Sequence, residues 1–254
     1  LLRNASRAGT ASMRAECTPP APRYVASVSY PRSGHSMTVR IMRRYFGHDF
    51  RVCEFYHDHH GDCCDCFPCI NSSINLTKNH DFELTDPNHP GIPKVKSVPY
   101  LVMVRNYLEA SVSGYQLFLR RNPDTRKSWK RYVEISLPHY QRFIQKWVLS
   151  NDSIEKLVIR YEDLTADPYR VLGEIASFFQ PGEQLDTARL GQLIDSVESE
   201  DSDAKRTKLV QGSGVQATRK IEDFRHFNTR FFRNLEKELT DEFSALGYDR
   251  RYAA

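Results

Sequence analysis

A short polar segment near the N-terminus has the residue types of an anion-binding loop. Arg32, Ser33, Gly34 and Ser36 occur in the sequence SYPRSGHS, directly after the apolar run YVASV and before a helix-like segment. A loop between a strand and a helix offers backbone N–H groups and the partial positive charge of a helix N-terminus. We call residues 31–36 the anion loop. It lacks the Gly-Lys-Ser/Thr sequence of a nucleotidase P-loop, which argues against a nucleotide kinase.

A second candidate anion site follows the apolar run that ends at Arg105. Ser113 lies eight residues further on, across an expected strand-to-helix turn, so its hydroxyl and the Arg105 guanidinium could converge on one ligand. Two separate anion sites with no obvious aspartate for Mg²⁺ indicate a nucleotide that carries phosphates at both ends.

The elements that must position these residues alternate between strands and helices. Three short apolar runs, at 24–30, 100–105 and 156–161, predict buried parallel strands. Apolar spacing and capping residues predict helices at 36–46, 107–121, 139–148, 169–179 and 229–247. This pattern predicts an α/β protein whose single three-layer domain, residues 24–254, has a central mostly parallel sheet and a strand-loop-helix anion site. Residues 1–23 lack periodicity and are interpreted as a tail or linker.

Four motifs in order resemble one enzyme family. SYPRSGHS, VRNYLEASVSGY, IRYEDL and TRKIEDFRHF are similar to motifs of the sulfotransferases that use 3'-phosphoadenosine 5'-phosphosulfate, PAPS. The resemblance runs from about Tyr24 to Phe227. It implies a P-loop-like fold and in-line transfer of a sulfuryl group from PAPS to an acceptor, which leaves 3'-phosphoadenosine 5'-phosphate, PAP. The reaction so implied requires no metal.

The resemblance also assigns roles to residues of this chain. The anion loop is similar to the family's 5'-phosphosulfate loop, with Arg32 in place of a lysine and Met37 in place of a tryptophan that flanks the adenine. Arg105 and Ser113 match the 3'-phosphate motif, and Ile221 stands where its C-terminal part has glycine. The residues so assigned to the nucleotide are Arg32, Ser33, Gly34, His35, Ser36, Met37, Arg105, Ser113, Arg219 and Lys220.

A general base is expected in the segment LTKNHDF. It is similar to the Lys-Thr-His segment of the family, which makes His80 the predicted base and Lys78, with Arg32, the cations beside the sulfuryl group. A histidine suits this task because its ordinary pKa of about 6.5 lets it accept a proton near neutrality.

The sequence says less about the acceptor and the binding partners than about the nucleotide. The net charge of +4 is too small to indicate a nucleic-acid binder, and no apolar run is long enough to cross a membrane. We favour a small hydroxylated acceptor, or an amine. A glycan acceptor would suit the basic residues Arg120, Arg121, Arg126, Lys127, Lys130 and Arg131, although such a run is more often a solvated helix face. A catalytically inactive PAPS-binding protein and a homodimer both stay open.

Cysteines and sequons bear on the compartment. Cys53, Cys63, Cys64, Cys66 and Cys69 crowd beside His57, His59 and His60, whereas Cys17 stands alone. A zinc site could use these ligands, but no second pair completes the pattern, so local disulfides or reduced thiols are favoured. Sequons at Asn4, Asn71, Asn75 and Asn151 are compatible with a secretory route. A cytoplasmic enzyme is expected, with the Golgi lumen as the alternative if an anchor has been removed.

Overall fold

Five parallel strands form the centre of the fold. The computed structural model describes residues 21–55, 64, 66–86, 88–89, 91–206 and 220–252, and for 198–206 only the backbone. The strands are β1 (Val25–Ser29), β2 (Arg51–Glu54), β3 (Ile74–Asn79), β4 (Tyr100–Val104) and β5 (Lys156–Arg160). They pair in the order β2-β3-β1-β4-β5, and every pair is parallel. The expected α/β fold is therefore confirmed, with a sheet that is parallel throughout its described strands.

Strand β3 was not recognised from apolar pattern because it buries polar side chains. All its residues are buried, yet its sequence is INLTKN. Hydrogen bonds make this burial tolerable: the Asn75 carboxamide accepts from the Arg51 backbone N–H at 2.9 Å, and the Thr77 hydroxyl lies 2.7 Å from that of Tyr24.

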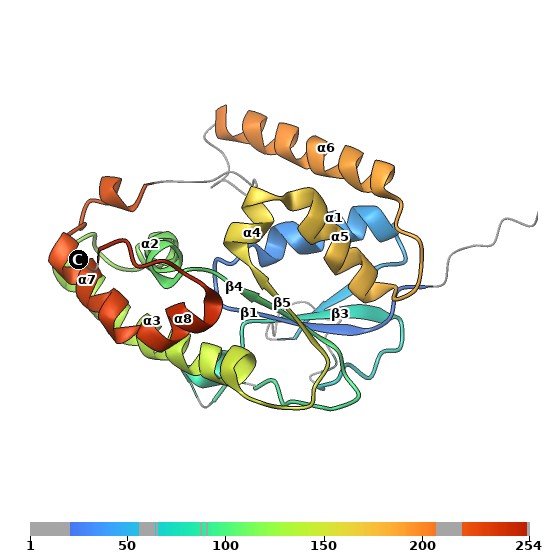
Figure 1. Cartoon of the computed structure of the whole chain (residues 1–254), viewed down its shortest axis with the longest axis horizontal. Coiled ribbons are helices and arrows are strands. Elements are labelled where there is room, and N and C mark those ends of the chain that lie inside the picture. Colours follow the sequence, from blue (N-terminus) through green and yellow to red (C-terminus); the bar gives the residue numbers. More distant parts are fainter. Residues whose placement is uncertain are drawn as a thin grey trace, which may run out of the picture.

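Helices cover both faces of the sheet (Figure 1). They are α1 (His35–Phe46), α2 (Tyr107–Phe118), α3 (Arg126–Ile144), α4 (Tyr161–Ala166), α5 (Pro168–Phe179), α6 (Thr187–Arg206), α7 (Thr229–Glu238) and α8 (Thr240–Leu246). A π-helical turn, Gln145–Leu149, continues α3. The expected helix 229–247 is in fact two helices, because Leu239 leaves the helical conformation at φ −105° and ψ 22°.

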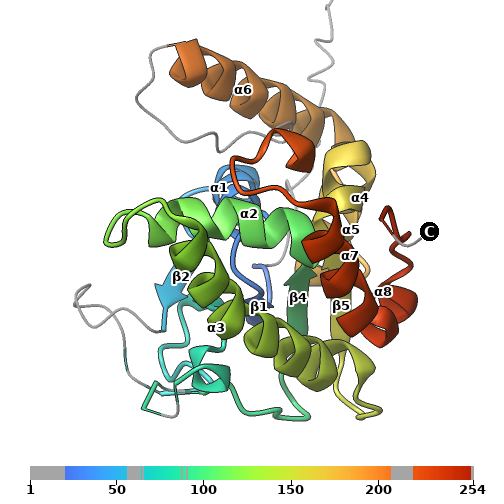
Figure 2. The ribbon, with the colours of Figure 1, turned by 90° about the vertical axis from the view of Figure 1, so that its left-hand side faces the viewer.

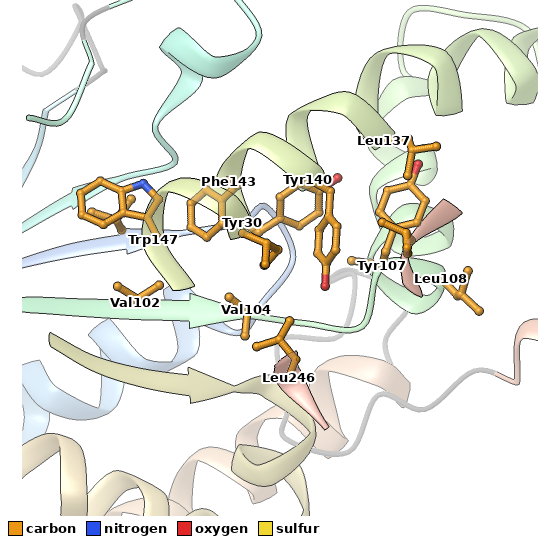
Figure 3. Close-up of a cluster of buried hydrophobic side chains, with 14 of the residues drawn as sticks. Tyr30, Val102, Val104, Tyr107, Leu108, Leu137, Tyr140, Phe143, Trp147 and Leu246 are labelled. Atoms are coloured by element: carbon orange, nitrogen blue, oxygen red, sulfur yellow. The ribbon is translucent and has the colours of Figure 1, made fainter. Parts of the chain in front are cut away.

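Each face of the sheet has its own apolar cluster. Helices α1, α5 and α6 pack on one face against side chains such as Leu76 and Met103. On the other face lie α2, α3, α7 and α8 (Figures 1 and 2). The helix predicted at 139–148 from apolar spacing is confirmed there as the end of α3 with the π-helical turn, and its Tyr140, Phe143 and Trp147 are fully buried. Figure 3 shows them in a row beside Val102 and Val104 of β4 and Tyr30 at the end of β1.

The strand order decides where a site can form. β1 lies between β3 and β4, so the chain leaves β1 at the point where the sheet order reverses. In open parallel sheets, ligands bind outside the carboxyl ends of the strands at such a switch point. The anion loop after β1, His80 after β3 and Arg105 after β4 all lie at this edge.

Candidate active site

The anion loop has a strained backbone. Arg32 has a φ of +73°, which is uncommon for a residue with a side chain, and Gly34 has a φ of +83°. A Cβ on Gly34 would lie 2.9 Å from Cδ2 of Tyr161 and 3.1 Å from a methyl of Leu164. Glycine at this position is therefore required both by the backbone conformation and by the close approach of α4.

Arg32, Arg105 and Ser113 meet at one place. Nε of Arg32 donates to the Ser113 hydroxyl at 2.9 Å, and Nη1 of Arg105 donates to the backbone carbonyl of Arg32 at 3.2 Å. The Arg105 guanidinium also lies 4.2 Å above the centre of the Tyr161 ring. Burial and the nearby Arg105 charge lower the pKa of Arg32. The two anion sites expected from sequence are thus physically joined through these side chains.

His80 is bound to the end of β1 through a defined ring nitrogen. Its Nδ1 lies 2.9 Å from the Ser29 carbonyl oxygen. A carbonyl oxygen can only accept, so Nδ1 carries the proton and Nε2 carries the lone pair that a base needs. Burial, with smaller contributions from the charges of Lys78 and Arg32, lowers the pKa of His80 to about 4. His80 is therefore neutral at physiological pH.

Lys78 lines a pocket of about 430 Å³ between α1 and the sheet edge. The other lining residues are Ser36, Val39, Arg40, Arg43, Arg44 and Glu54. Lys78 Nζ lies 3.4 Å from a Glu54 carboxylate oxygen. Sequence reasoning missed Glu54 and the three arginines. The arginines share one side of α1 because they lie four, seven and eight residues after Ser36, a spacing that could have been read from the sequence.

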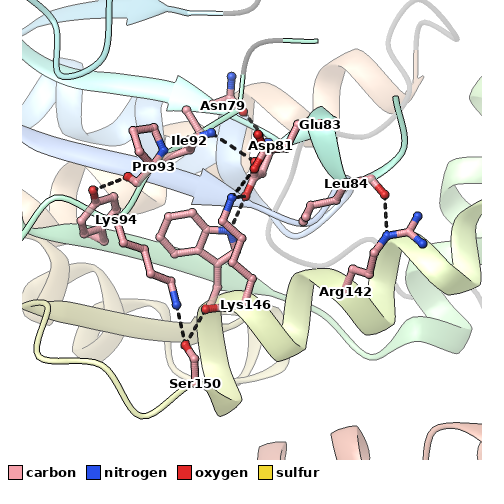
Figure 4. A network of polar contacts seen from close by, with 12 residues as sticks. Asn79, Asp81, Glu83, Leu84, Ile92, Pro93, Lys94, Arg142, Lys146 and Ser150 are labelled. Carbon is pink, nitrogen blue, oxygen red and sulfur yellow. Dashed lines mark hydrogen bonds and ion pairs between the residues drawn. The ribbon is translucent and has the colours of Figure 1, made fainter. Parts of the chain in front are cut away.

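Asp81 holds the segment that carries His80. Its side chain is fully buried and pairs with Lys146 Nζ at 2.9 Å, accepts from Trp147 Nε1 at 2.6 Å and accepts from the Ile92 backbone at 3.2 Å. Figure 4 shows the segment after β3 beside the π-helical turn that continues α3, to which these contacts join it. Burial raises the pKa of Asp81. No sequence signal marked this residue, since its partners lie far away in the chain.

The remaining predicted nucleotide residues occupy different surroundings. Ser33 is fully buried, whereas Met37 of α1 is 5% exposed and packs in the apolar cluster between this helix and the sheet. Ser36 and Lys220 are exposed. Arg219 lies outside the described residues. The contact expected between Met37 and adenine stays a prediction, as do the nucleotide roles of the other residues.

The basic run and the cysteine cluster are two further features that the sequence analysis singled out. The six basic side chains between Arg120 and Arg131 are all exposed around the connection of α2 to α3. The four described cysteines, Cys53, Cys64, Cys66 and Cys69, form no disulfide, and the Sγ atoms of Cys64 and Cys69 are 3.4 Å apart. No group of metal ligands is present among the residues that the structure describes. Cys17, Cys63 and the three nearby histidines lie outside that part of the chain.

Comparison with known proteins decides the family. A model of the sulfotransferase domain matches residues 23–236. The chain belongs to the sulfotransferase family. The solved structure of mouse sulfotransferase SULT7A1 complexed with PAP matches this sulfotransferase with a TM-score of 0.54 and 16% sequence identity, over 90% of this chain and 89% of that one. At that identity the likeness concerns the fold, which is confirmed as the sulfotransferase fold. No curated protein sequence matches the chain. No helix in the described ranges is long and apolar enough to span a bilayer.

Proposed function

We propose that this sulfotransferase moves the sulfuryl group of PAPS to a hydroxyl or amine of an acceptor. The observation that carries the proposal is the convergence of Arg32, Ser113 and Arg105 at the sheet switch point, with His80 on the neighbouring strand end. The solved structure of SULT7A1, which contains PAP, supports the choice of nucleotide.

The site residues fit a nucleotide with two anionic ends. The Ser33 hydroxyl and Nε of Arg105 are buried and have no hydrogen-bond partner among the described residues. Buried donors of this kind are normally paired, and an anionic ligand would pair them. We assign the 5' end to the anion loop and Arg32, and the 3'-phosphate to Arg105 and Ser113, with Arg219 and Lys220 closing the site.

When bound, PAPS would supply an activated sulfuryl group. His80 would take the acceptor proton on Nε2, the nitrogen that the Ser29 carbonyl leaves with its lone pair. Arg32 and Lys78 would stabilise the charge that spreads over the transferring and departing oxygens. Arg32 holds its proton at all relevant pH values, so its contribution is charge and a hydrogen bond rather than proton donation.

A small hydroxylated molecule is the proposed acceptor. A second candidate is an anionic glycan, and the pocket beside Lys78 favours it, because Arg40, Arg43 and Arg44 outnumber the single Glu54 there. A comparison of the turnover rates with neutral phenols or alcohols and with acidic oligosaccharides as acceptors distinguishes these two candidates. Loss of the oligosaccharide activity alone in Arg43→Ala would support the second.

A cytoplasmic enzyme is proposed, with a lumenal one as the alternative. The four described cysteines form no disulfide, as expected in a reducing compartment. Asn75 of one sequon is buried in β3, where its carboxamide nitrogen donates to the Pro22 carbonyl at 2.7 Å. A glycan on that nitrogen would break this contact. Homodimer formation stays an untested prediction.

Calorimetry with PAP and with adenosine 5'-phosphate tests the nucleotide assignment. We expect PAP to bind at least 10-fold more tightly, because only PAP presents a 3'-phosphate to Arg105 and Ser113. Equal affinities would remove the main support for the proposal. For the base, His80→Ala should leave PAP affinity unchanged and lower turnover by about 10²-fold or more, the usual scale for general acid–base catalysis. If Glu54→Gln has that effect instead, the carboxylate beside Lys78 is the base.

A further inference from the structure

The hydroxyl of Ser29 lies between two histidines. Its Oγ is 2.7 Å from Nδ1 of His35 and 2.9 Å from Nδ1 of His80. Ser29 is fully buried as the last residue of β1. His35 begins α1 within the anion loop, and His80 directly follows β3. One hydroxyl therefore joins a residue of the proposed nucleotide loop to the proposed base, which are 45 positions apart in the sequence.

The Ser29 carbonyl determines which atom donates in each hydrogen bond between His80, Ser29 and His35. At rest, His80 Nδ1 carries a proton because it faces that carbonyl oxygen, and the same N–H also faces the Ser29 Oγ. With Oγ accepting from His80, its own proton is directed to Nδ1 of His35. His35 is then protonated on Nε2. That nitrogen is buried and has no partner among the residues with described side chains.

We propose that Ser29 relays a proton from His80 to His35 during sulfuryl transfer, an inference that rests on the proposed function. The acceptor O–H bond breaks as its oxygen bonds to sulfur, and the proton goes to Nε2 of His80. The Nδ1 proton of His80 passes to Ser29 Oγ, and the Oγ proton passes to Nδ1 of His35. His80 ends neutral and His35 ends as an imidazolium. When the products leave, the protons move back along the same path and His80 Nε2 releases its proton to water, which restores both resting tautomers.

The direction of the relay follows the charge that the reaction creates. Burial lowers the pKa of His35 well below its ordinary value, with contributions from His80 and Lys78, so His35 is neutral at rest. The bond between sulfur and the 5'-phosphate breaks at the anion loop, and the departing oxygen becomes more negative there. A positive charge on His35, which lies in the anion loop, would be stabilised by that oxygen; Lys78 opposes a charge on either ring, but Arg32 opposes one on His80 as well.

The other described ionisable groups around His35 and His80 offer no second route for the proton. His139 contacts Tyr30 and Phe82, and burial, with a smaller contribution from His80, lowers its pKa to about 4. Glu54 acts on His80 in the opposite direction to Lys78 and Arg32. Of the ionisable groups named here, His35 and His80 are the two that hydrogen-bond to the Ser29 hydroxyl.

Nitrogen-15 NMR of the histidine rings tests the hydrogen-bond chain without requiring turnover. In the full-length protein saturated with PAP, we expect the Nδ1–H tautomer for His80 and the Nε2–H tautomer for His35. Ser29→Ala should leave His80 unchanged, since the carbonyl remains, and shift His35 toward a tautomer mixture. Ser27→Ala is the matched control, because Ser27 lies two residues earlier on β1, is equally buried, and its hydroxyl has no partner among the described residues. An Nδ1–H tautomer on both histidines would overturn the relay.

Kinetics test the transfer itself. We expect Ser29→Ala and His35→Gln to lower kcat by about 10- to 100-fold with little change in the KM for PAPS, and Ser29→Thr to restore most of the rate. Full activity in Ser29→Ala would overturn the proposal. If the wild-type protein binds no PAP, the proposed function fails, while the ring tautomers, then measured without PAP, still decide whether the chain of hydrogen bonds exists.

Discussion

Gly34→Ala tests how closely the anion loop and α4 depend on each other. The added methyl group would meet Tyr161 at 2.9 Å and Leu164 at 3.1 Å, contacts too short for carbon atoms. The positive φ of Gly34 adds strain of about 1–2 kcal/mol for a residue with a Cβ. Displacing the Tyr161 ring should cost a further ~1–3 kcal/mol, the usual range for overpacking. The expected loss in the free energy of unfolding is therefore about 2–5 kcal/mol.

Gly182→Ala is the matched control for this variant. Gly182 has a φ of +86°, close to that of Gly34, but a Cβ there has no atom within 4 Å. Its substitution should cost only the backbone strain, about 1–2 kcal/mol. Urea denaturation gives both values, and calorimetry should show at least 10-fold weaker PAP binding for Gly34→Ala alone, because the displaced Tyr161 ring supports Arg105. Equal loss of stability in the two variants would refute the argument from the contact with α4.

Three further predictions concern the site and its support. Arg105→Ala should weaken PAP binding by about 1.5–3 kcal/mol, which is the range for a hydrogen bond to a charged group. It should weaken the binding of adenosine 5'-phosphate less, because that nucleotide has no 3'-phosphate. If calorimetry shows equal losses for the two nucleotides, the 3'-phosphate binds elsewhere. Asp81→Asn should lower the free energy of unfolding by about 3–5 kcal/mol because it breaks a buried ion pair, whereas the half-exposed Glu83→Gln should cost less than about 1 kcal/mol in the same urea titration. The pKa values of His80 and His139 are about 4 in the folded protein and about 6.5 when unfolded. The unfolded chain therefore binds more protons between these values, so stability should fall as the pH drops from about 6.5 to 4 and then level off; urea midpoints that stay constant over this range would contradict the burial of both rings.

Much of the fold could be predicted because its signals are local. The apolar runs of β1, β4 and β5 and the stripe of α3 are short-range patterns, and the structure has them where the sequence places them. The strand β3 escaped this reasoning, since its buried polar side chains are matched by partners such as Tyr24, which no local pattern reveals. The division of the last helix at Leu239 was missed for a similar reason, because the apolar spacing continues across it.

The sequence by itself determined the types of residue at the site and the family. Arg32, the glycine of the anion loop and the Arg105–Ser113 spacing are all visible within short segments. Only the tertiary structure decided which of them touch. The strand order places β3 and β4 on either side of β1, and the register that pairs Val28 with Asn79 brings Ser29 level with His80. Parallel pairing is set by the whole sheet rather than by neighbouring residues, so the hydroxyl shared by two histidines exists only once the sheet has formed.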